Sequence, residues 1–469
     1  MRMKKIFTLL LALVGMVNTA SATDYVVAGS GAVNGSSTWD NNSDLNTMIE
    51  TSPGSGVYYL KVQTTLSSGT EVKAAPLEKG SYNRAFADEG QGRTGDWSYG
   101  INVGETESYD LYYYLDPTNH IFDVFATPML RSNIGDSGRG NFNWKYESVS
   151  DFTQDDYFNW HYDMPYASLA AENSFFVYTK VNYRSVYTYT EPKTELTLPA
   201  SITSAVYFNN DRYTWATSTE SYSEEHRWFF DKPDYTCDFV RVSLNYSVAT
   251  QSMSINVVPY IAKTANGTNA GLKLGYSTFG AETDVDLSSL PSGVTAHTAT
   301  VGAKGIITYN TATELAAGEG VLLTNTTGSN VNLSIPVKAS ATSNPSNNLV
   351  RVADDELAQT TNESGYIYAN YILTKNTVPN NNADLGWYLV NDEGCTSLTV
   401  GTAYLKVLKE TPSSPSRAFF PLWSEEPDGV EAVATDPAVD GQAYNLAGQR
   451  VAKTTKGLYI VNGKKVMVK

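Results

Sequence analysis

The sequence alternates short runs of β-branched and aromatic residues with Gly, Asn, Ser and Pro, and it has almost no helical periodicity. Such runs occupy residues 56–66, 109–115, 121–126 and 174–183. Side chains of this kind favour pleated strands, and the frequent turn residues end each strand soon after it begins. The longest stretch with a helical pattern, residues 44–50, has room for about two turns. The chain is therefore predicted to be all-β, with the patterning of β-sandwiches.

Two segments of the first half repeat one pattern, which is a strand, a short polar turn, a second strand and a proline. They are YYYLDPTNHIFDVFATPML at residues 112–130 and VSLNYSVATQSMSINVVPYI at residues 242–261. Each is predicted to be the closing hairpin of one β-module. The repeat divides the first half into a module over residues 23–128 and a degenerate, insertion-bearing β-sandwich copy over residues 129–262.

The second half has a different composition. Residues 263–423 are richer in Thr, Val and Gly and are predicted to form a third β-module of unknown activity. Residues 424–440 contain six acids and two prolines, which is typical of a solvated linker. Residues 441–469 follow as a short basic hairpin tail.

The first 22 residues have the pattern of a secretory signal peptide. Three basic residues precede an apolar run at residues 6–17, and the small residues at 20–22 provide a cleavage site near Ala22. The apolar run is shorter than the roughly 18–20 residues that span a bilayer. The mature chain is therefore expected to be secreted or at the cell surface, without a transmembrane segment.

The net charge of −16 disfavours nucleic acid and anionic membranes as partners. Two cysteines, Cys237 and Cys395, are too few for a disulfide framework or a cysteine zinc site. They fall in different predicted modules, so two buried thiols are favoured over one bridge. The four histidines have no zinc-ligand spacing. Neither a metal nor another cofactor is expected.

The basic tail carries a set of spaced residues that recur in one class of secretion signal: Asn445, Gly448, Gly457, Tyr459, Gly463, Lys464 and the final lysine. With these residues it resembles the end of the type A C-terminal sorting domain of the type IX secretion system, found in the Bacteroidota. The resemblance implies contact with the secretion machinery and removal or attachment at the cell surface. Asn462-Gly463 also predicts a type I′ turn between two strands. The alternative is an ordinary terminal hairpin packed on the preceding module.

Two longer segments also carry resemblances. Residues 24–128 have Trp39, Lys73 and Trp97 ahead of a closing hairpin. They look like the small immunoglobulin-like modules of the starch-utilisation and pullulanase-associated type, which implies an immunoglobulin-like fold and binding of α-glucans through aromatic residues. The anchors of residues 263–423 include GYSTFG, GWYLV and SRAFFPLW. This segment is similar to a β-rich module that precedes such tails in secreted Bacteroidota proteins, and the likeness implies no activity.

Sugar binding needs flat aromatic faces for pyranose rings and nearby groups that exchange hydrogen bonds with hydroxyls. Trp39 lies in the polar loop SSTWDNN, and Trp97 and Tyr99 are spaced to share one face of an extended segment. Lys73 and Asn83 could supply polar contacts. The predicted carbohydrate site is therefore Trp39, Lys73, Trp97 and Tyr99. The alternative is that both tryptophans belong to the core or anchor a loop.

Other candidate sites are weaker. In the second copy, Trp144, Trp160 and Trp215 stand in polar, aromatic loops. The string GQGRTG opens no helix after a strand, GDSGRG lacks the partners of a catalytic triad, and DNNSD at residues 40–44 lacks the Gly and Glu of a calcium loop. Adjacent acids such as Asp155 and Asp156 point to opposite faces of an extended segment. The chain is accordingly predicted not to be an enzyme.

These observations favour a non-catalytic secreted or surface protein that binds polysaccharide, with a starch-like α-glucan as the favoured ligand. The alternative is a structural or adhesive surface protein that binds a host or neighbouring protein. A hydrolase within residues 129–262 comes third. Exposed rings at the predicted carbohydrate site would favour sugar, and buried rings would favour adhesion. A histidine–carboxylate pair in a cleft would favour an enzyme.

Overall fold

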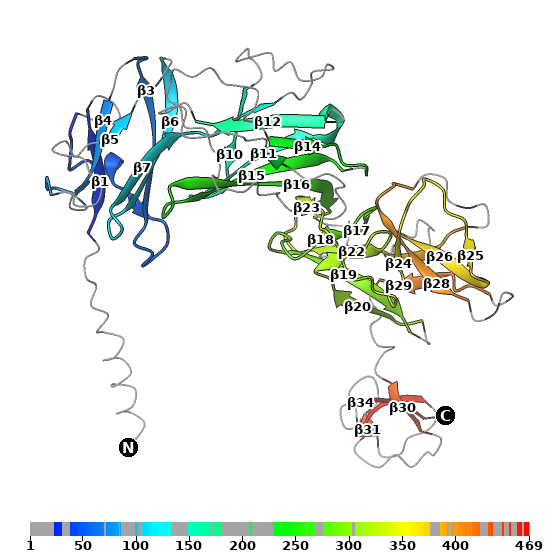
Figure 1. The fold of residues 1–469 in the computed structure, drawn as a ribbon. Helices are drawn as coiled ribbons and strands as arrows, with labels where there is room; N and C mark the ends of the chain where they lie inside the picture. The colour runs from blue at the N-terminus through cyan, green and yellow to red at the C-terminus, as the bar shows by residue number, and fades with distance from the viewer. Residues whose placement is uncertain are drawn as a thin grey trace, which may run out of the picture. The chain divides into compact units, whose positions relative to one another are not determined.

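The computed structural model divides the chain into two compact units, Met1–Tyr260 and Ile261–Lys469 (Figure 1). The structure describes residues 23–30, 38–69, 72–83, 85, 99–101, 103, 106–132, 149–169, 172–179, 207–208, 228–235, 237–267, 275–302, 305–375, 385–391, 394, 398–409, 411, 413, 415–418, 419–422, 430–434, 443–444, 450–451, 457–461 and 464–468. Within these residues it consists of antiparallel sheets, one parallel strand pair and two single-turn 3₁₀ helices, without an α-helix. The expected all-β class is confirmed.

The first unit begins with two sheets that enclose one core. One has the order β1(Tyr25–Gly29)-β4(Val72–Glu78)-β5(Tyr99–Ile101), and the other has the order β2(Ile49–Glu50)-β3(Tyr58–Leu66)-β6(Glu107–Asp116)-β7(Ile121–Ala126). Val27 and Ala74 from the first sheet share a buried cluster with Leu111, Tyr113 and Val124 from the second. Burial of these side chains holds the two sheets together.

The helix expected at residues 44–50 is wrong beyond its first turn. The 3₁₀ helix η1(Asp44–Asn46) starts where the Ser43 hydroxyl accepts a hydrogen bond from the backbone N–H of Leu45. It stops because the chain then pairs with β1, through a bridge between Thr47 and Val26 and a bond from Met48 N to Tyr25 O. Pairing with a distant strand overrides the local helical pattern.

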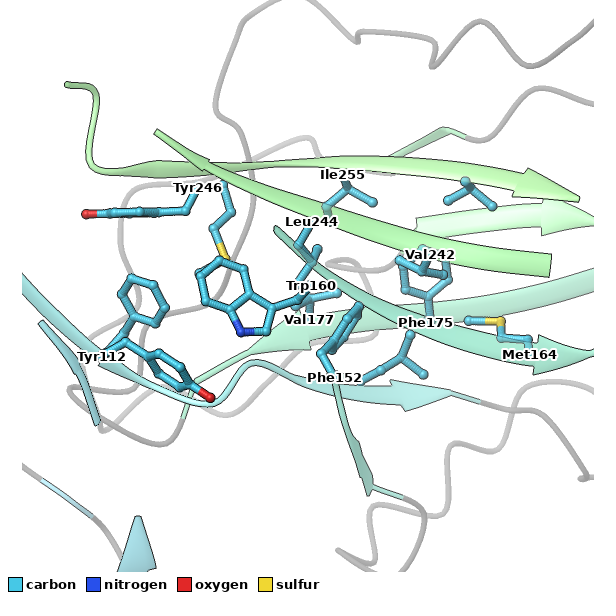
Figure 2. Close-up of a cluster of buried hydrophobic side chains, with 14 of the residues drawn as sticks. Tyr112, Phe152, Trp160, Met164, Phe175, Val177, Val242, Leu244, Tyr246 and Ile255 are labelled. Carbon is cyan, nitrogen blue, oxygen red and sulfur yellow. The ribbon is translucent and has the colours of Figure 1, made fainter. Parts of the chain in front are cut away.

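The rest of the first unit forms a second pair of sheets. The order of one is β13(Tyr207–Phe208)-β14(Trp228–Asp231)-β12(Glu172–Tyr178)-β8(Met129–Ser132)-β9(Val149–Asp151), and the order of the other is β10(Thr153–Gln154)-β11(Asn159–Pro165)-β15(Phe239–Ser247)-β16(Ser252–Ala265). The 3₁₀ helix η4(Tyr166–Ser168) follows β11. Trp160 lies at the centre of the buried cluster that includes Phe175, Val177, Val242 and Leu244 (Figure 2).

Both predicted hairpins are confirmed. Asp116 pairs with Ile121 in β6–β7, and Ser247 pairs with Ser252 in β15–β16, so each loop has four residues. The last loop residue is left-handed in both hairpins, with φ of 58° at His120 and 49° at Gln251. The sequence echo therefore corresponds to two hairpins with similar turns.

The modules expected at residues 23–128 and 129–262 share one buried cluster, in addition to the separate core of the first pair of sheets. Tyr112, Tyr114 and Phe125 on the outer face of β6–β7 belong to the same buried cluster as Trp160 and Tyr246 of the second pair of sheets. The Tyr112 and Phe125 rings meet the Trp160 indole edge to face at 5.6 and 5.7 Å between centroids. Strand β6 is consequently buried on both faces.

Among its described residues, the second unit has two large buried clusters and a smaller one. One sheet has the order β17(Gly275–Gly280)-β22(Gly320–Asn325)-β19(Val294–Val301)-β20(Ile307–Thr311), and β18(Val285–Asp286) pairs with β21(Glu314–Leu315). A larger sheet has the order β24(Leu349–Arg351)-β28(Ala403–Leu408)-β26(Tyr366–Lys375)-β27(Leu385–Leu389)-β29(Phe419–Pro421), with β25(Thr360–Glu363) beside β26. The end of β16 belongs to this unit from Ile261 onward, and there Thr264 donates its hydroxyl to Asn332 of the neighbouring strand β23(Val331–Pro336). Trp387 is fully buried in one large cluster and Phe279 in the other.

The C-terminal residues form a sheet larger than the expected hairpin. Its order is β30(Val430–Ala434)-β34(Lys464–Val468)-β33(Gly457–Val461)-β31(Ala443–Tyr444)-β32(Arg450–Val451). The predicted β33–β34 hairpin is confirmed by the pairing of Val461 with Lys464, and its turn residues lie outside the described ones. β30 lies within the residues expected to be an acidic linker. β30 joins the sheet by parallel pairing with β34. The two strands lie too far apart in the sequence for a local pattern to predict this pairing.

Candidate functional site

Trp39 lies at a corner of the first unit, in an unusual backbone conformation. Its N–H donates to Gly29 O at 2.7 Å, which fixes it beside the end of β1. Its φ is 56°, in a region that bulky L-residues rarely occupy. The residue is 37% exposed, so part of the indole faces solvent. A strained, partly exposed tryptophan is a candidate for ligand contact.

Lys73 belongs to the same corner. Ser30, which follows β1, donates its N–H to Lys73 O at 2.8 Å, and its hydroxyl oxygen accepts from Lys73 N at 2.8 Å. Gly29, the residue to which Trp39 is bound, directly precedes Ser30. The backbones of Trp39 and Lys73 are thus hydrogen-bonded to two consecutive residues, Gly29 and Ser30, which places the two backbone segments close together.

Tyr99 lies on the opposite face of the same sheet from Lys73. It pairs with Ala74, whose side chain is in the core, so neighbouring Lys73 points the other way. The Tyr99 hydroxyl donates to Asp123 Oδ1 at 3.2 Å, and its ring meets Phe122 edge to face. The structure therefore does not bring Tyr99 together with Trp39 and Lys73. Trp97 lies outside the described residues.

A second exposed aromatic residue, Tyr82, was not among the sequence candidates. It is 73% exposed in the turn after β4. This turn contacts the loop of Trp39, because Gly80 N donates to Asn41 O at 2.8 Å and Lys79 forms an ion pair with Asp44. The sequence signal was an aromatic residue within a Gly-Ser-Tyr-Asn turn, where no core position is expected.

Polar and apolar side chains lie on the same two loops as these rings. Asn83 donates its side-chain amide to Glu78 Oε2 at 3.3 Å, and Asn42 N donates to Asp40 Oδ1 at 2.9 Å. Leu45, on the same loop as Trp39, is 73% exposed. We call the loop of residues 38–47 and the turn of residues 79–83 the aromatic corner. Its amides and carboxylates are suited to hydroxyl groups, whereas Leu45 is suited to apolar contact.

The calcium-like string within the aromatic corner is occupied by protein contacts. Lys79 pairs with Asp44 and lowers the pKa of that carboxyl below its ordinary value. Asn46 donates its side-chain amide to Asp40 O at 3.2 Å. Across the described part of the chain, no group of three His, Cys, Asp or Glu side chains is placed to hold a metal ion.

Trp160 is a core residue, so its candidacy as a sugar platform is wrong. It is fully buried. Side chains alternate between the two faces of β11, and that of Trp160 lies on the face that packs in the core. Among the described residues its indole nitrogen has no hydrogen-bond partner, and the ring of Tyr112 lies nearly perpendicular to the indole (Figure 2). Trp144 and Trp215 lie outside the described residues.

A histidine–carboxylate pair occurs on the outer face of the β10-β11-β15-β16 sheet. His161 Nδ1 lies 2.6 Å from Asp155 Oδ1, and Ser243 is directly opposite His161 on β15. The second contact on this face is a two-bond ion pair, with Arg241 donating to Asp163 at 2.6 and 2.8 Å. The backbone around Ser243 is committed to pairing with two neighbouring strands, so it offers no ready oxyanion donors.

The remaining predicted residues divide between described and undescribed segments. Gly457 and Tyr459 are on β33 and Lys464 begins β34, whereas Asn445, Gly448 and Gly463 lie outside the described residues. The Cys237 thiol is free and buried, and burial raises its pKa to about 12. Cys395 also lies outside the described residues.

Comparison with protein-family models and with the curated proteins finds no match to this chain. Among the described residues, no helix has the length and apolar character needed to cross a bilayer.

Proposed function

We propose that the first unit binds glycan chains at the aromatic corner, without catalysing their cleavage. The observation that carries this proposal is the backbone of Trp39, which holds a partly exposed indole at φ 56°. Such strain persists where the surroundings enforce it, and it is found preferentially at ligand sites. Tyr82 on the adjoining turn supplies a second ring, and Asn83 supplies an amide for sugar hydroxyls. Lys73 is kept as a further polar contact, because its backbone is bonded to Ser30, next to the residue that binds Trp39.

The finer architecture belongs to the same proposal. We infer an immunoglobulin-like sandwich for residues 23–128, since a sheet of three strands and a sheet of four strands enclose one core. The second pair of sheets in this unit is a copy with the same closing hairpin. A starch-like α-glucan is the favoured ligand, because curved chains present the apolar faces of successive rings to separate aromatic side chains.

The test is retention on insoluble starch, measured for the full chain and for three variants. Trp39→Asn removes the ring with a residue that tolerates a positive φ, so the fold is retained. We expect Trp39→Asn and Tyr82→Ala each to lower retention at least tenfold, with Leu45→Ala as the matched control that retains binding. Wild-type protein that binds neither starch nor any other polysaccharide would refute the proposal.

The alternative is a surface protein that binds another protein through the aromatic corner. The exposed Leu45 is the observation that favours it, because an aliphatic side chain contributes to protein contacts and little to sugar stacking. In that case Leu45→Ala lowers binding to the partner as strongly as Tyr82→Ala does. The same set of variants therefore separates the two candidate functions.

The C-terminal sheet is proposed to direct export of the protein to the cell surface. The parallel strand β30 supports a folded unit that begins at Val430, upstream of the basic tail. We expect deletion of residues 430–469 to leave the protein in the periplasm of a type IX-competent host, measured by cell fractionation. Unchanged surface exposure of the deleted protein would show that the sheet is only structural.

A further inference from the structure

Asp123 is a fully buried carboxyl group between the two pairs of sheets in the first unit. It lies on β7, at one edge of its sheet as described, directly opposite Tyr114 of β6. Tyr246 of β15 donates its hydroxyl to Asp123 Oδ2 at 2.6 Å, which joins the first pair of sheets to the second. Tyr99 and the backbone of Val124 donate to Oδ1 at 3.2 and 2.9 Å.

Aromatic rings close this junction against water. The ring of Tyr246 lies 4.6 Å from Tyr114 and 4.9 Å from Phe125 between centroids. Tyr114 also donates its hydroxyl to Tyr157 O, and Tyr59 exchanges a hydrogen bond with Gln154. A carboxylate in such surroundings loses its hydration, so the cost of its charge depends on how tightly the junction is closed.

We propose that the protonation of Asp123 sets how firmly the two pairs of sheets hold together, with the neutral carboxyl group favouring the closed junction. Opening the junction hydrates the carboxylate, and ionisation therefore favours opening. The first unit then becomes a proton-sensitive joint that is tight in acid and looser above neutral pH.

Among the described residues, the other titratable groups near this joint are tyrosine hydroxyls, the ion pair of Lys61 with Asp110 beside Tyr112, and one more distant acid. Tyr99 faces Asp123 from β5, Tyr114 from β6 and Tyr246 from β15, and Asp156 acts on Tyr114. Burial raises the pKa of Asp123 to about 7, and the bonds from Tyr246 and Val124 N oppose that rise. The pKa of Asp123 in the folded chain thus exceeds its ordinary value. The contribution of the neutral carboxyl group to the stability of the closed junction is therefore complete in acid, and it is lost as the pH rises towards and through 7.

Hydrogen exchange of the full chain, followed by mass spectrometry, tests the joint. Protection factors of peptides from β7 and β15, corrected for intrinsic exchange, should fall on the order of tenfold to a hundredfold between about pH 5 and about pH 8. Peptides from β17 and β22 in the second unit serve as internal controls. Asp123→Asn should abolish the dependence, and Asp110→Asn, on the same hairpin, should preserve it.

Tyr246→Phe gives a second, independent readout. It removes a donor to the charged form, so the midpoint of the transition should move to higher pH, whereas a merely structural loss would weaken the joint at every pH. A pH-independent wild type, an Asp123→Asn protein with the wild-type profile, or an unmoved midpoint in Tyr246→Phe would each overturn the proposal. If Asp123→Asn does not fold, the midpoint of Tyr246→Phe decides.

Discussion

The hairpins β6–β7 and β15–β16 have the same turn length, but their outer faces differ in residue type and burial. Aligned from their turns, Tyr113 and Val124 of the first correspond to Leu244 and Ile255 of the second, and all four are buried. On the other face, the buried residues Tyr112, Tyr114, Asp123 and Phe125 correspond to Ser243, Asn245, Ser254 and Asn256, none of which is buried. One hairpin covers a neighbour and the other faces outward.

The difference teaches that the residue types on the outer face of a repeated hairpin depend on whether another sheet packs against that face. The core positions keep the same apolar character in both copies because both close a sandwich. The outer positions are aromatic only where a second pair of sheets packs against them. A run such as YDLYYYLD, which does not alternate, is thus the mark of a strand that is buried on both faces.

The strongest test of this comparison exchanges one aligned residue. Tyr114→Asn places the residue of the second hairpin in the first and leaves a large hole in the shared core, so we expect a loss of about 3–5 kcal/mol in the free energy of unfolding. The reciprocal change, Asn245→Tyr, adds a ring to an exposed position and should stay within about 0.5 kcal/mol. Urea unfolding measures both. Equal effects would show that the two outer faces have the same environment.

Truncation of the aligned core residues should destabilise the protein to a similar extent in the two hairpins. Val124→Ala and Ile255→Ala each remove methyl groups from a buried position, with expected losses of about 2–4 kcal/mol. Chemical denaturation of each variant gives the values. A loss below about 0.5 kcal/mol at either position would mean that one hairpin does not close a core.

The carboxyl group at one outer position should give the first hairpin a pH dependence that the second lacks. With the pKa of Asp123 at about 7 in the folded chain, its contribution to unfolding stability falls between about pH 4 and pH 7, by about 2–4 kcal/mol. Asp123→Asn should flatten this part of the curve. Ser254→Asp puts a carboxyl group at the exposed aligned position and should leave the slope of the wild type unchanged.

The smallest expected effect concerns the turns. His120→Gly and Gln251→Gly relieve a left-handed residue in each hairpin, at φ 58° and 49°. The relief is opposed by the entropy that glycine adds to the unfolded chain, so each should change stability by about 0.5 kcal/mol, on the stabilising side. Thermal unfolding of the two variants provides the measurement. If one variant is stabilised and the other destabilised, the two turns differ in energy despite their similar backbone angles.

Local patterns predicted the strands and both hairpins, since turn residues and β-branched runs act over short stretches of sequence. They failed where a partner lies far along the chain. β30 depends on β34, and residues 47–48 leave the helical pattern to pair with β1. No local pattern marks these pairings, which only the assembled sheets reveal.

The candidate site was predicted less completely than the fold. Trp39 was named as a candidate because it lies in a polar loop, with a core or loop-anchoring role as the alternative. Tyr99 was assigned to the same site because its spacing from Trp97 fits one face, but spacing does not reveal that its hydroxyl is bonded to Asp123. Tyr82 was overlooked, although an aromatic side chain in a turn of small polar residues has nowhere to be buried.

The position of β34 between β30 and β33 has a consequence for biosynthesis. β30 leaves the ribosome well before β34, its only neighbour among the described strands, so this pairing cannot form until residues 464–468 emerge. A chain that stops short of Lys464 lacks the strand that joins both sides of the sheet. A receptor that recognises the finished sheet would therefore also reject incomplete translation products.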